Sequence, residues 1–304
     1  MERLFVGLQY ILPHHLISRL VGWLTRIRWA PFKRAFIAGF RRHYRIDLSE
    51  ASESDPEAYP TFNAFFTRSL REHARPMPAD PDEMACPVDG VVSQAGAVRA
   101  GTLLQAKGYH YDLDALLGGG TEGLKAGAVF ATLYLAPSNY HRIHMPVAGR
   151  LVSMRYEPGR LFSVNDTTAR HVPGLFSRNE RVACIFETAR GPLAMVLVGA
   201  LNVGNIETVW AGQVAPDRWR RGHVTDYPGT GESVVSLQRG EEMGRFNMGS
   251  TVIVIAPDSW TLDPSLAPGR PVRVGQTLAL PSDPEAGDRL AAEPPQEPTR
   301  TADT

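Results

Sequence analysis

Near the N-terminus, between residues 4 and 44, apolar and basic positions alternate with the period of a helix. Apolar side chains recur at steps of three and four residues, with arginines largely between them: Leu16, Leu20, Trp23, Leu24 and Ile27 against Arg19, Arg26 and Arg28. Pro13 and Pro31 interrupt this pattern. Because proline ends or kinks a helix, we expect two or three short amphipathic helices. A further short helix is predicted within 61–70.

The charge of the N-terminal segment favours a membrane surface. Residues 1–45 hold nine lysines and arginines against one acid, Glu2, and their aromatic residues suit a bilayer interface: Trp23, Trp29, Phe32, Phe36 and Phe40. A basic amphipathic helix with aromatics is typical of a segment lying in the membrane plane. We therefore predict a membrane-associating helical region over 1–75. An ordinary helix packed on its own core is the alternative.

From Val88 onward, short apolar runs are separated by Gly, Pro, Asn and Asp, which is the pattern of β-strands. Strands are predicted within 89–98, 127–137, 149–159, 181–188, 192–204, 207–214, 250–257 and 273–280. Residues 111–119 are the expected helical exception. Many short strands at close spacing favour a sandwich or barrel. The predicted fold class is α+β, a predominantly antiparallel β sandwich or barrel-like core over 76–281 with N-terminal amphipathic helices.

Composition narrows the class of protein. The 304 residues are 43% hydrophobic and 21% charged with a net charge of zero, so the global basic field of a nucleic-acid-binding protein is absent. Cys86 and Cys184 are too few for a disulfide framework or a cysteine-based metal site, and indicate structural thiols in a reducing compartment. No apolar run reaches the roughly 18–20 residues of a membrane span. The tail over 282–304, rich in Pro, Glu and Thr, is predicted to be disordered.

Four short motifs contain residues able to do chemistry. They are CPVDGVVS with Asp89, YHRIHMP with His141 and His144, LFSVN with Ser163 and Asn165, and NMGST with Ser250. Taken singly, each has an ordinary structural explanation, such as a turn at Asp89 or a turn before a buried strand at Ser250. Pro137 and Pro146 bracket the two histidines and no third ligand of suitable spacing stands out, so no metal site is predicted.

Asp89, one of the two histidines (His141 or His144) and Ser250 together supply the parts of a nucleophile-activating triad. In such a triad a histidine takes the proton of a hydroxyl, and a carboxylate orients the histidine. The sequence around Ser250 is not the Gly-x-Ser-x-Gly turn of lipases and esterases. The residues alone therefore indicate an activated serine without fixing what it attacks.

Nine longer sequence segments, which include these motifs, favour one interpretation of them. In order, they are LQYILP, TFNAFFTRSLR, PVDGVVSQ, LQAKGY, YHRIHMP, PGRLFSVN, NERVACIF, VGALNVGNIETVWAG and GEEMGRFNMGSTVI. With these blocks, which span roughly 8–280, the chain resembles the bacterial phosphatidylserine decarboxylases, a family of pyruvoyl-dependent type I proenzymes. The family's processing motif is usually Leu-Gly-Ser-Thr, and here Met248 replaces the leucine. Methionine is close to leucine in volume and polarity, so we expect little effect.

This resemblance implies that the bond between Gly249 and Ser250 cuts itself and that Ser250 becomes a pyruvoyl group. Ser250 Oγ attacks the Gly249 carbonyl, which a residue without a side chain leaves open to approach, and an N-to-O shift gives an ester. Loss of the Ser250 α-proton expels the ester and leaves dehydroalanine, and hydrolysis then yields pyruvoyl and ammonia. The resemblance assigns the base to His144, with Asp89 orienting it and stabilising its cation.

The implied reaction is the decarboxylation of phosphatidylserine to phosphatidylethanolamine, with covalent pyruvate as the cofactor and electron sink. The serine amine condenses with the pyruvoyl group as a Schiff base, carbon dioxide leaves, a proton returns to the α-carbon and hydrolysis releases the product. His141 is expected to donate that proton or to contact the carboxylate side, with His144 as the competitor for this role. Ser163 and Asn165 are expected to contact the head group.

The remaining expectations concern partners and location. The large chain, 1–249, and the small chain, 250–304, should stay associated because the small chain opens with a core strand, and the resemblance allows a homodimer. A two-tailed lipid does not leave the bilayer readily, so we expect peripheral attachment to an anionic membrane surface, the cytoplasmic side of the inner membrane. The alternatives are a membrane-surface serine hydrolase that acts on lipids through an uncleaved Ser250, a binding module without chemistry, and a decarboxylase for a serine head group on another backbone.

Overall fold

The computed structural model describes residues 2–125, 127–201, 206–214, 221–231, 233–247 and 250–282. Its helices are α1 (Glu2–Ile11), α2 (His14–Leu24), α3 (Ala30–Tyr44), α4 (Phe62–Phe66), α5 (Leu113–Leu117), α6 (Asp166–His171) and α7 (Leu175–Arg178). Its strands are β1 (Met84–Ala85), β2 (Gly90–Ala97), β3 (Thr102–Ala106), β4 (Tyr109–Asp112), β5 (Val129–Tyr134), β6 (Arg142–His144), β7 (Gly149–Glu157), β8 (Arg181–Thr188), β9 (Gly191–Val198), β10 (Ile206–Thr208), β11 (Gly212–Val214), β12 (His223–Asp226), β13 (Ser236–Leu237), β14 (Glu242–Phe246), β15 (Thr251–Ala256), β16 (Trp260–Leu262), β17 (Pro271–Val272) and β18 (Thr277–Pro281). Met248, Gly249 and the predicted disordered tail beyond Ser282 lie outside the described residues.

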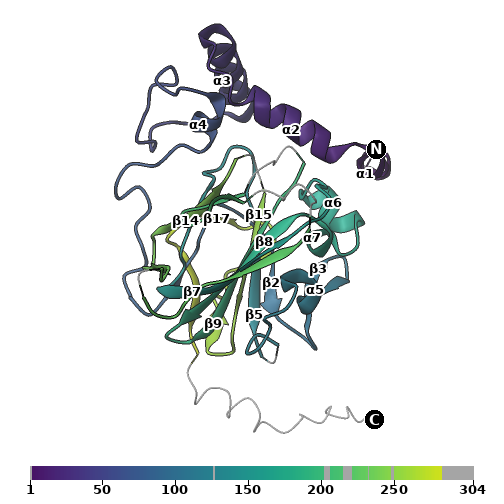
Figure 1. Cartoon of the computed structure of the whole chain (residues 1–304), viewed down its shortest axis with the longest axis vertical. Coiled ribbons are helices and arrows are strands. Elements are labelled where there is room, and N and C mark those ends of the chain that lie inside the picture. The colour runs from purple at the N-terminus through teal and green to yellow at the C-terminus, as the bar shows by residue number, and fades with distance from the viewer. Residues whose placement is uncertain are drawn as a thin grey trace, which may run out of the picture.

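The N-terminal helices gather at one end of the β body (Figure 1). Pro13 separates α1 from α2, and Pro31 lies in the first turn of α3, where a missing backbone N–H costs nothing. Helix α4 begins at Thr61, whose hydroxyl accepts a hydrogen bond from the Ala64 N–H at 3.1 Å. Helices α3 and α4 share a small core of their own, in which the rings of Phe36 and Phe62 stack 4.2 Å apart.

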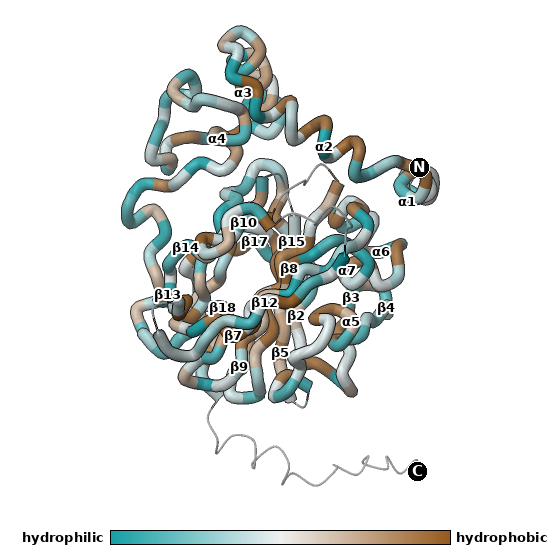
Figure 2. Tube along the Cα trace, in the orientation of Figure 1, coloured by the Kyte–Doolittle hydropathy of each residue, from teal (hydrophilic) through white to brown (hydrophobic). Residues whose placement is uncertain are grey.

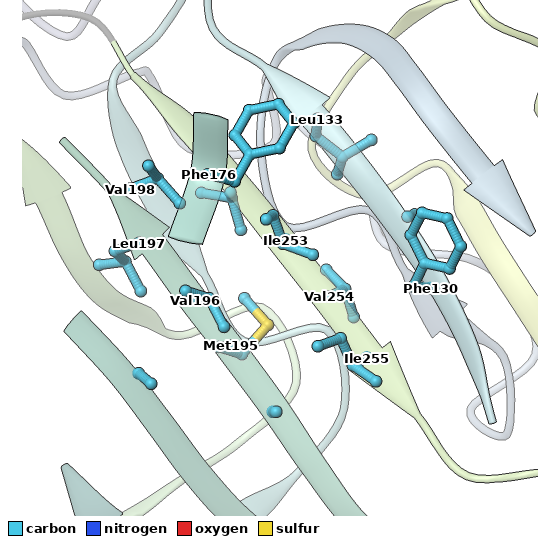
Figure 3. Close-up of a cluster of buried hydrophobic side chains, with 14 of the residues drawn as sticks. Phe130, Leu133, Phe176, Met195, Val196, Leu197, Val198, Ile253, Val254 and Ile255 are labelled. Carbon is cyan, nitrogen blue, oxygen red and sulfur yellow. The ribbon is translucent and has the colours of Figure 1, made fainter. Parts of the chain in front are cut away.

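The main sheet runs in the order β12-β7-β8-β9-β15-β5-β2-β17, with β13 also paired to β7, and every one of these pairs is antiparallel. Strand β15 lies at its centre, between β9 and β5. The sequence TVIVIA explains this position, because all six residues are buried and a strand covered on both faces has no need of alternating polar positions. Figure 3 shows Ile253, Val254 and Ile255 packed among apolar side chains of β5, β9 and α7.

Smaller sheets complete the body: β11-β10-β14-β6, β1-β18-β16 and the hairpin β3-β4. The pairs within these sheets are antiparallel too, and no sheet closes into a barrel over the described residues. The predicted α+β class with a mostly antiparallel core and N-terminal helices is therefore confirmed, in a sandwich-like arrangement. The sheet β11-β10-β14-β6 matters for function because β14 runs directly toward the predicted cleavage site.

Two predicted strands are broken by turns. The run over 207–214 is a hairpin, β10 and β11, in which Gly212 takes a left-handed φ of 65°. The run over 273–280 contributes only β18, because Gly275 turns the chain with a φ of 83° and its N–H bonds to the Cys86 carbonyl at 3.0 Å. Glycine adopts such φ values without a steric penalty. The apolar residues on either side of each glycine predicted a continuous strand, so neither turn was predicted.

Large apolar side chains are exposed along the N-terminal helices and their connection: Leu8, Ile11, Leu16, Leu20, Trp23 and Trp29. Figure 2 shows apolar stretches alternating with polar ones along α2. Their exposure runs from 51% at Leu8 to 82% at Ile11, which is unusual for residues of this kind in one segment. Among the residues described, no helix combines the length and the apolar character that crossing a bilayer requires.

Candidate active site

Ser250 stands directly before the central strand β15 and is fully buried. Its backbone carbonyl accepts a hydrogen bond from the Leu135 N–H at 2.9 Å, which extends the pairing of Thr251 with Tyr134 on β5 by one residue. Its hydroxyl oxygen has no hydrogen-bond partner among the described residues. A buried, unpaired hydroxyl is uncommon in a folded protein, so this one is available for another purpose.

His144, at the end of β6, is held by two hydrogen bonds. The Gly240 carbonyl lies 2.7 Å from Nδ1, and the Tyr140 hydroxyl lies 3.0 Å from Nε2. A carbonyl can only accept, so Nδ1 carries the proton of the neutral ring, and Nε2 is left as a base that accepts from Tyr140. Burial lowers the pKa of His144, while the bond to Gly240 and the nearby carboxylates of Glu242 and Asp89 act in the opposite direction.

Asp89 precedes β2 and is held by an arginine. Arg75 Nε lies 2.9 Å from Oδ1 and Arg75 Nη2 lies 2.6 Å from Oδ2, while the Val274 N–H donates to Oδ1 at 2.9 Å. The structure thus brings Asp89 into the neighbourhood of His144 without a hydrogen bond between the two. The group that orients the His144 ring is the Gly240 carbonyl.

His141 is fully buried and is the last residue of the loop that connects β5 to β6. Its ring stacks on Phe66 with centroids 4.0 Å apart, and neither ring nitrogen has a hydrogen-bond partner of good geometry among the described residues. Burial, with a smaller effect of the Arg68 cation, lowers the pKa of His141 to about 3. The ring is therefore neutral near pH 7 and retains unused hydrogen-bonding capacity.

The side chain of Asn165 and the backbone of Ser163 are held in local hydrogen bonds. The Asn165 side chain caps α6 by accepting from the Thr168 N–H at 3.0 Å. The Ser163 N–H donates to Gln9 Oε1 of α1 at 3.1 Å, and its carbonyl accepts from the Thr168 hydroxyl at 2.5 Å. These bonds fix the LFSVN segment against the N-terminal helix. Head-group contact by either side chain stays a prediction.

The comparisons with known proteins agree with one another. A family model described as phosphatidylserine decarboxylase matches residues 62–280, and a second, described as PSD, matches residues 4–45. A phosphatidylserine decarboxylase proenzyme of Pseudomonas aeruginosa is 51% identical over 284 residues, covering 92% of this chain and 98% of the relative. One of Shewanella baltica is 54% identical over 257 residues, covering 84% of this chain and 88% of the relative.

The chain belongs to the phosphatidylserine decarboxylase family. The PSD model covers most of helices α1 to α3, and the phosphatidylserine decarboxylase model covers α4 and the β body. Several of the sequence blocks lie beside these residues: Leu135, after β5, bonds to the Ser250 carbonyl, and β14 pairs with β6, which ends at His144.

Three residues of this family member were missed from sequence alone. Tyr140 touches His144, Arg75 holds Asp89, and Arg68 influences His141. Tyr140 and Arg68 lie within the YHRIHMP and TFNAFFTRSLR blocks, so their motifs were visible but their partners were not. A tyrosine four residues from a histidine and an arginine 14 residues from an aspartate carry no spacing rule outside a helix, so only the fold pairs them.

Proposed function

We propose that the chain decarboxylates phosphatidylserine to phosphatidylethanolamine and carbon dioxide, in phospholipid biosynthesis, after it cuts itself between Gly249 and Ser250. Family membership supports the substrate class and the reaction. The observation that supports the maturation step is the buried hydroxyl of Ser250 before the central strand, which has no hydrogen-bond partner among the residues that the structure describes. That environment excludes competing water, which would otherwise hydrolyse the chain instead of leaving a modified serine.

In the proposed cut, Ser250 Oγ attacks the carbonyl carbon of Gly249 and its proton passes to a base. The peptide nitrogen leaves that carbon as an amine, and the chain becomes an ester through Oγ. Removal of the Ser250 α-proton expels the Gly249 carboxylate, and water then releases ammonia from the new N-terminus. We assign the base to His144, whose Nε2 is the unprotonated nitrogen, and Asp89 stabilises the imidazolium through space.

The cofactor of the mature enzyme is then the pyruvoyl group derived from Ser250, which supplies an electrophilic carbonyl and an electron sink for the carboxylate to be lost. The site fits such a small uncharged group, because the Ser250 side chain is buried and its neighbours on β5 and β9 are apolar. His141, which is neutral and has no hydrogen-bond partner of good geometry in the described part of the chain, either contacts the substrate carboxylate or returns the proton to the α-carbon. An anion beside it would raise its pKa and favour both roles.

The proposed cut leaves a small chain whose strands pair with strands of the large chain. It supplies β15 at the sheet centre and β17 beside β2, and β18 pairs with β1 of the large chain. The Val274 N–H also donates to Asp89. We therefore propose that the large chain, 1–249, and the small chain, 250–304, remain associated. A homodimer stays a proposal from family resemblance.

We also propose that the protein is peripheral on the cytoplasmic face of the inner membrane, on an anionic surface. The exposed apolar side chains of α1, α2 and the α2–α3 connection support this, since their burial in the interface removes them from water. Each nearby Lys or Arg contributes about 1 kcal/mol on an anionic leaflet. Reversing the charge of Arg26 and Arg28 should release protein into the soluble fraction. Unchanged sedimentation with membranes would contradict this placement.

The intact mass of purified protein under denaturing conditions tests the reaction class. Two species that together account for 33.4 kDa, with the small chain one ammonia lighter than plain hydrolysis gives, support the proposed cut and the pyruvoyl group. Ser250→Ala should give one intact chain. An intact wild-type chain that reacts with a fluorophosphonate would instead support a serine hydrolase with an uncleaved Ser250.

A further inference from the structure

A cavity of about 320 Å³ lies between the N-terminal helical region and the β body. Its lining includes four arginines, one catalytic candidate and the tyrosine that contacts His144: Arg45, Arg68, Arg75, Arg273, Asp89 and Tyr140. We refer to it as the arginine cavity. It shares a wall with the proposed active site, because the Tyr140 hydroxyl is 3.0 Å from His144 Nε2.

The carboxylates of the arginine cavity are already engaged. Asp89 is bound by Arg75 through both oxygens. Glu50 receives Arg75 Nη2 at 2.9 Å and Arg273 Nη1 at 3.1 Å. Asp47 accepts from the N–H and hydroxyl of Ser49. Glu50 and Asp89 are thus paired with Arg75 and Arg273, whereas Arg45 and Arg68 have no carboxylate within 4.0 Å among the described residues.

Arg68 is the buried one of these two, with 6% of its surface exposed. Its Nη1 has no hydrogen-bond partner within the described part of the chain, its Nη2 lies 3.4 Å from the Ser138 carbonyl, and its guanidinium lies 5.7 Å from the Phe65 ring centroid. Among the described residues no carboxylate lies within 4.0 Å of it. A buried cation needs a counter-ion or a full set of hydrogen bonds, and Arg68 has neither. Burial accordingly lowers its pKa.

We propose that the arginine cavity binds the phosphodiester group of the phospholipid head group, with Arg68 as the main donor and the exposed Arg45 at the rim. The planar fork of a guanidinium matches two phosphate oxygens. The volume is at the small end of ligand pockets, roughly 300–1,000 Å³, so it admits a head group and leaves acyl chains outside. The identity of the lipid rests on the proposed function.

The phosphodiester suits this site better than the carboxylate of the same head group. The carboxylate is the charge that decarboxylation removes, so a guanidinium paired with it stabilises the substrate more than the transition state and slows the reaction. The phosphodiester keeps its charge throughout. A cation bound to it holds the lipid without raising the barrier. Arg68 is thereby a binding residue for the phosphodiester. His141 remains as the group that can contact the serine carboxylate and α-carbon of the substrate.

Binding to the uncleaved Ser250→Ala protein tests the proposal without requiring any chemistry. The probes are a short-chain, water-soluble phosphatidylserine and, separately, inorganic phosphate, with the dissociation constant measured by titration calorimetry. Arg68→Gln should weaken binding of the lipid by about 10- to 100-fold, the value of a hydrogen bond to a charged group. Arg68→Lys should recover part of the loss. Arg45→Gln, at an exposed position that does not threaten folding, should weaken binding by a smaller factor.

Arg99→Gln is the matched control, because Arg99 is an exposed arginine of the body outside the arginine cavity. It should bind the lipid as the parent does. Lipid affinity that is unaffected by both Arg68→Gln and Arg45→Gln would overturn the proposal. Arg68-dependent binding of inorganic phosphate without binding of the lipid would overturn the lipid source and leave a free-phosphate site. A wild-type protein that binds the lipid through Arg68 yet releases no carbon dioxide would refute the proposed function and not this site.

Discussion

Gly90 allows the closest approach between the strand after Asp89 and the strand beside the cleavage site. A Cβ added at Gly90 would lie 2.4 Å from the Tyr134 carbonyl oxygen, 3.1 Å from its carbonyl carbon and 3.7 Å from Leu135 Cα. These atoms are backbone, and Tyr134 is fixed on its other side by pairing with Thr251. No flexible side chain can move away. Gly90→Ala should therefore push β2 away from β5.

The cost of this displacement should be about 3 kcal/mol, the upper part of the range for overpacking a filled core. For a domain of this size it corresponds to a melting temperature lower by roughly 6–12 °C. Gly96→Ala, on the same strand, is the matched control, since its Cβ would meet only the Phe130 ring at 3.9 Å. Thermal unfolding of both variants in the uncleaved Ser250→Ala protein keeps the covalent state constant.

A second readout follows from the neighbours of Gly90. Tyr134 and Leu135 hold Thr251 and the Ser250 carbonyl, so a shift of β5 should also slow self-cleavage when Ser250 is present. A pulse–chase experiment during cell-free synthesis measures this rate. Equal melting temperatures for Gly90→Ala and Gly96→Ala would refute the steric argument outright.

Three further predictions concern the groups around His144. Tyr140→Phe removes the hydroxyl that donates to the Nε2 lone pair and so frees that lone pair to take a proton; self-cleavage should be about 2- to 10-fold faster, measured by the same pulse–chase, and an unchanged rate would show that this bond has no part in the cut. Burial lowers the pKa of His144 below 6.5, so the base should stay unprotonated on acidification through that pH, and the cleavage rate should decline only at lower pH; a decline centred above 6.5 would contradict this. Arg75→Gln leaves the carboxylate of Asp89 buried without its cation and should lower the free energy of unfolding by about 3–5 kcal/mol in urea titrations, whereas a change within the error of the titration would mean that water replaces the arginine.

Much of the fold could be predicted because a helix or strand often follows from the apolar pattern of its own residues and needs no information about distant parts of the chain. The run TVIVIA requires a buried strand wherever it lies, and Pro13 and Pro31 divide the N-terminal helices by steric rules that involve only their neighbours. The division of 207–214 into a hairpin was missed because its turn at Gly212 lies inside an apolar run. A single glycine there is compatible with either a turn or a continuous strand.

The candidate site could be predicted as a set of residues but not as a set of contacts. Motif blocks located Ser250, His144 and Asp89, yet the group that orients His144 is the backbone carbonyl of Gly240, which any residue type could supply. The partner of Asp89 is Arg75, on a connector whose path the sequence does not determine. The reactivity of a residue follows from its side-chain type, which the sequence gives directly. The orientation of that side chain depends on backbone groups that are distant in the sequence.

Because β15 lies at the centre of the main sheet, the proposed cut before it would make unfolding of the protein hard to reverse. Before the cut, refolding is a first-order process of one chain. After a cut before Ser250, unfolding releases two separate chains, so recovery of the native state becomes second order and its equilibrium depends on protein concentration. Dilution alone then prevents refolding. A protein matured by the proposed cut would therefore persist through the height of its unfolding barrier, and a chain cut before β15 was in place could not refold to correct the error.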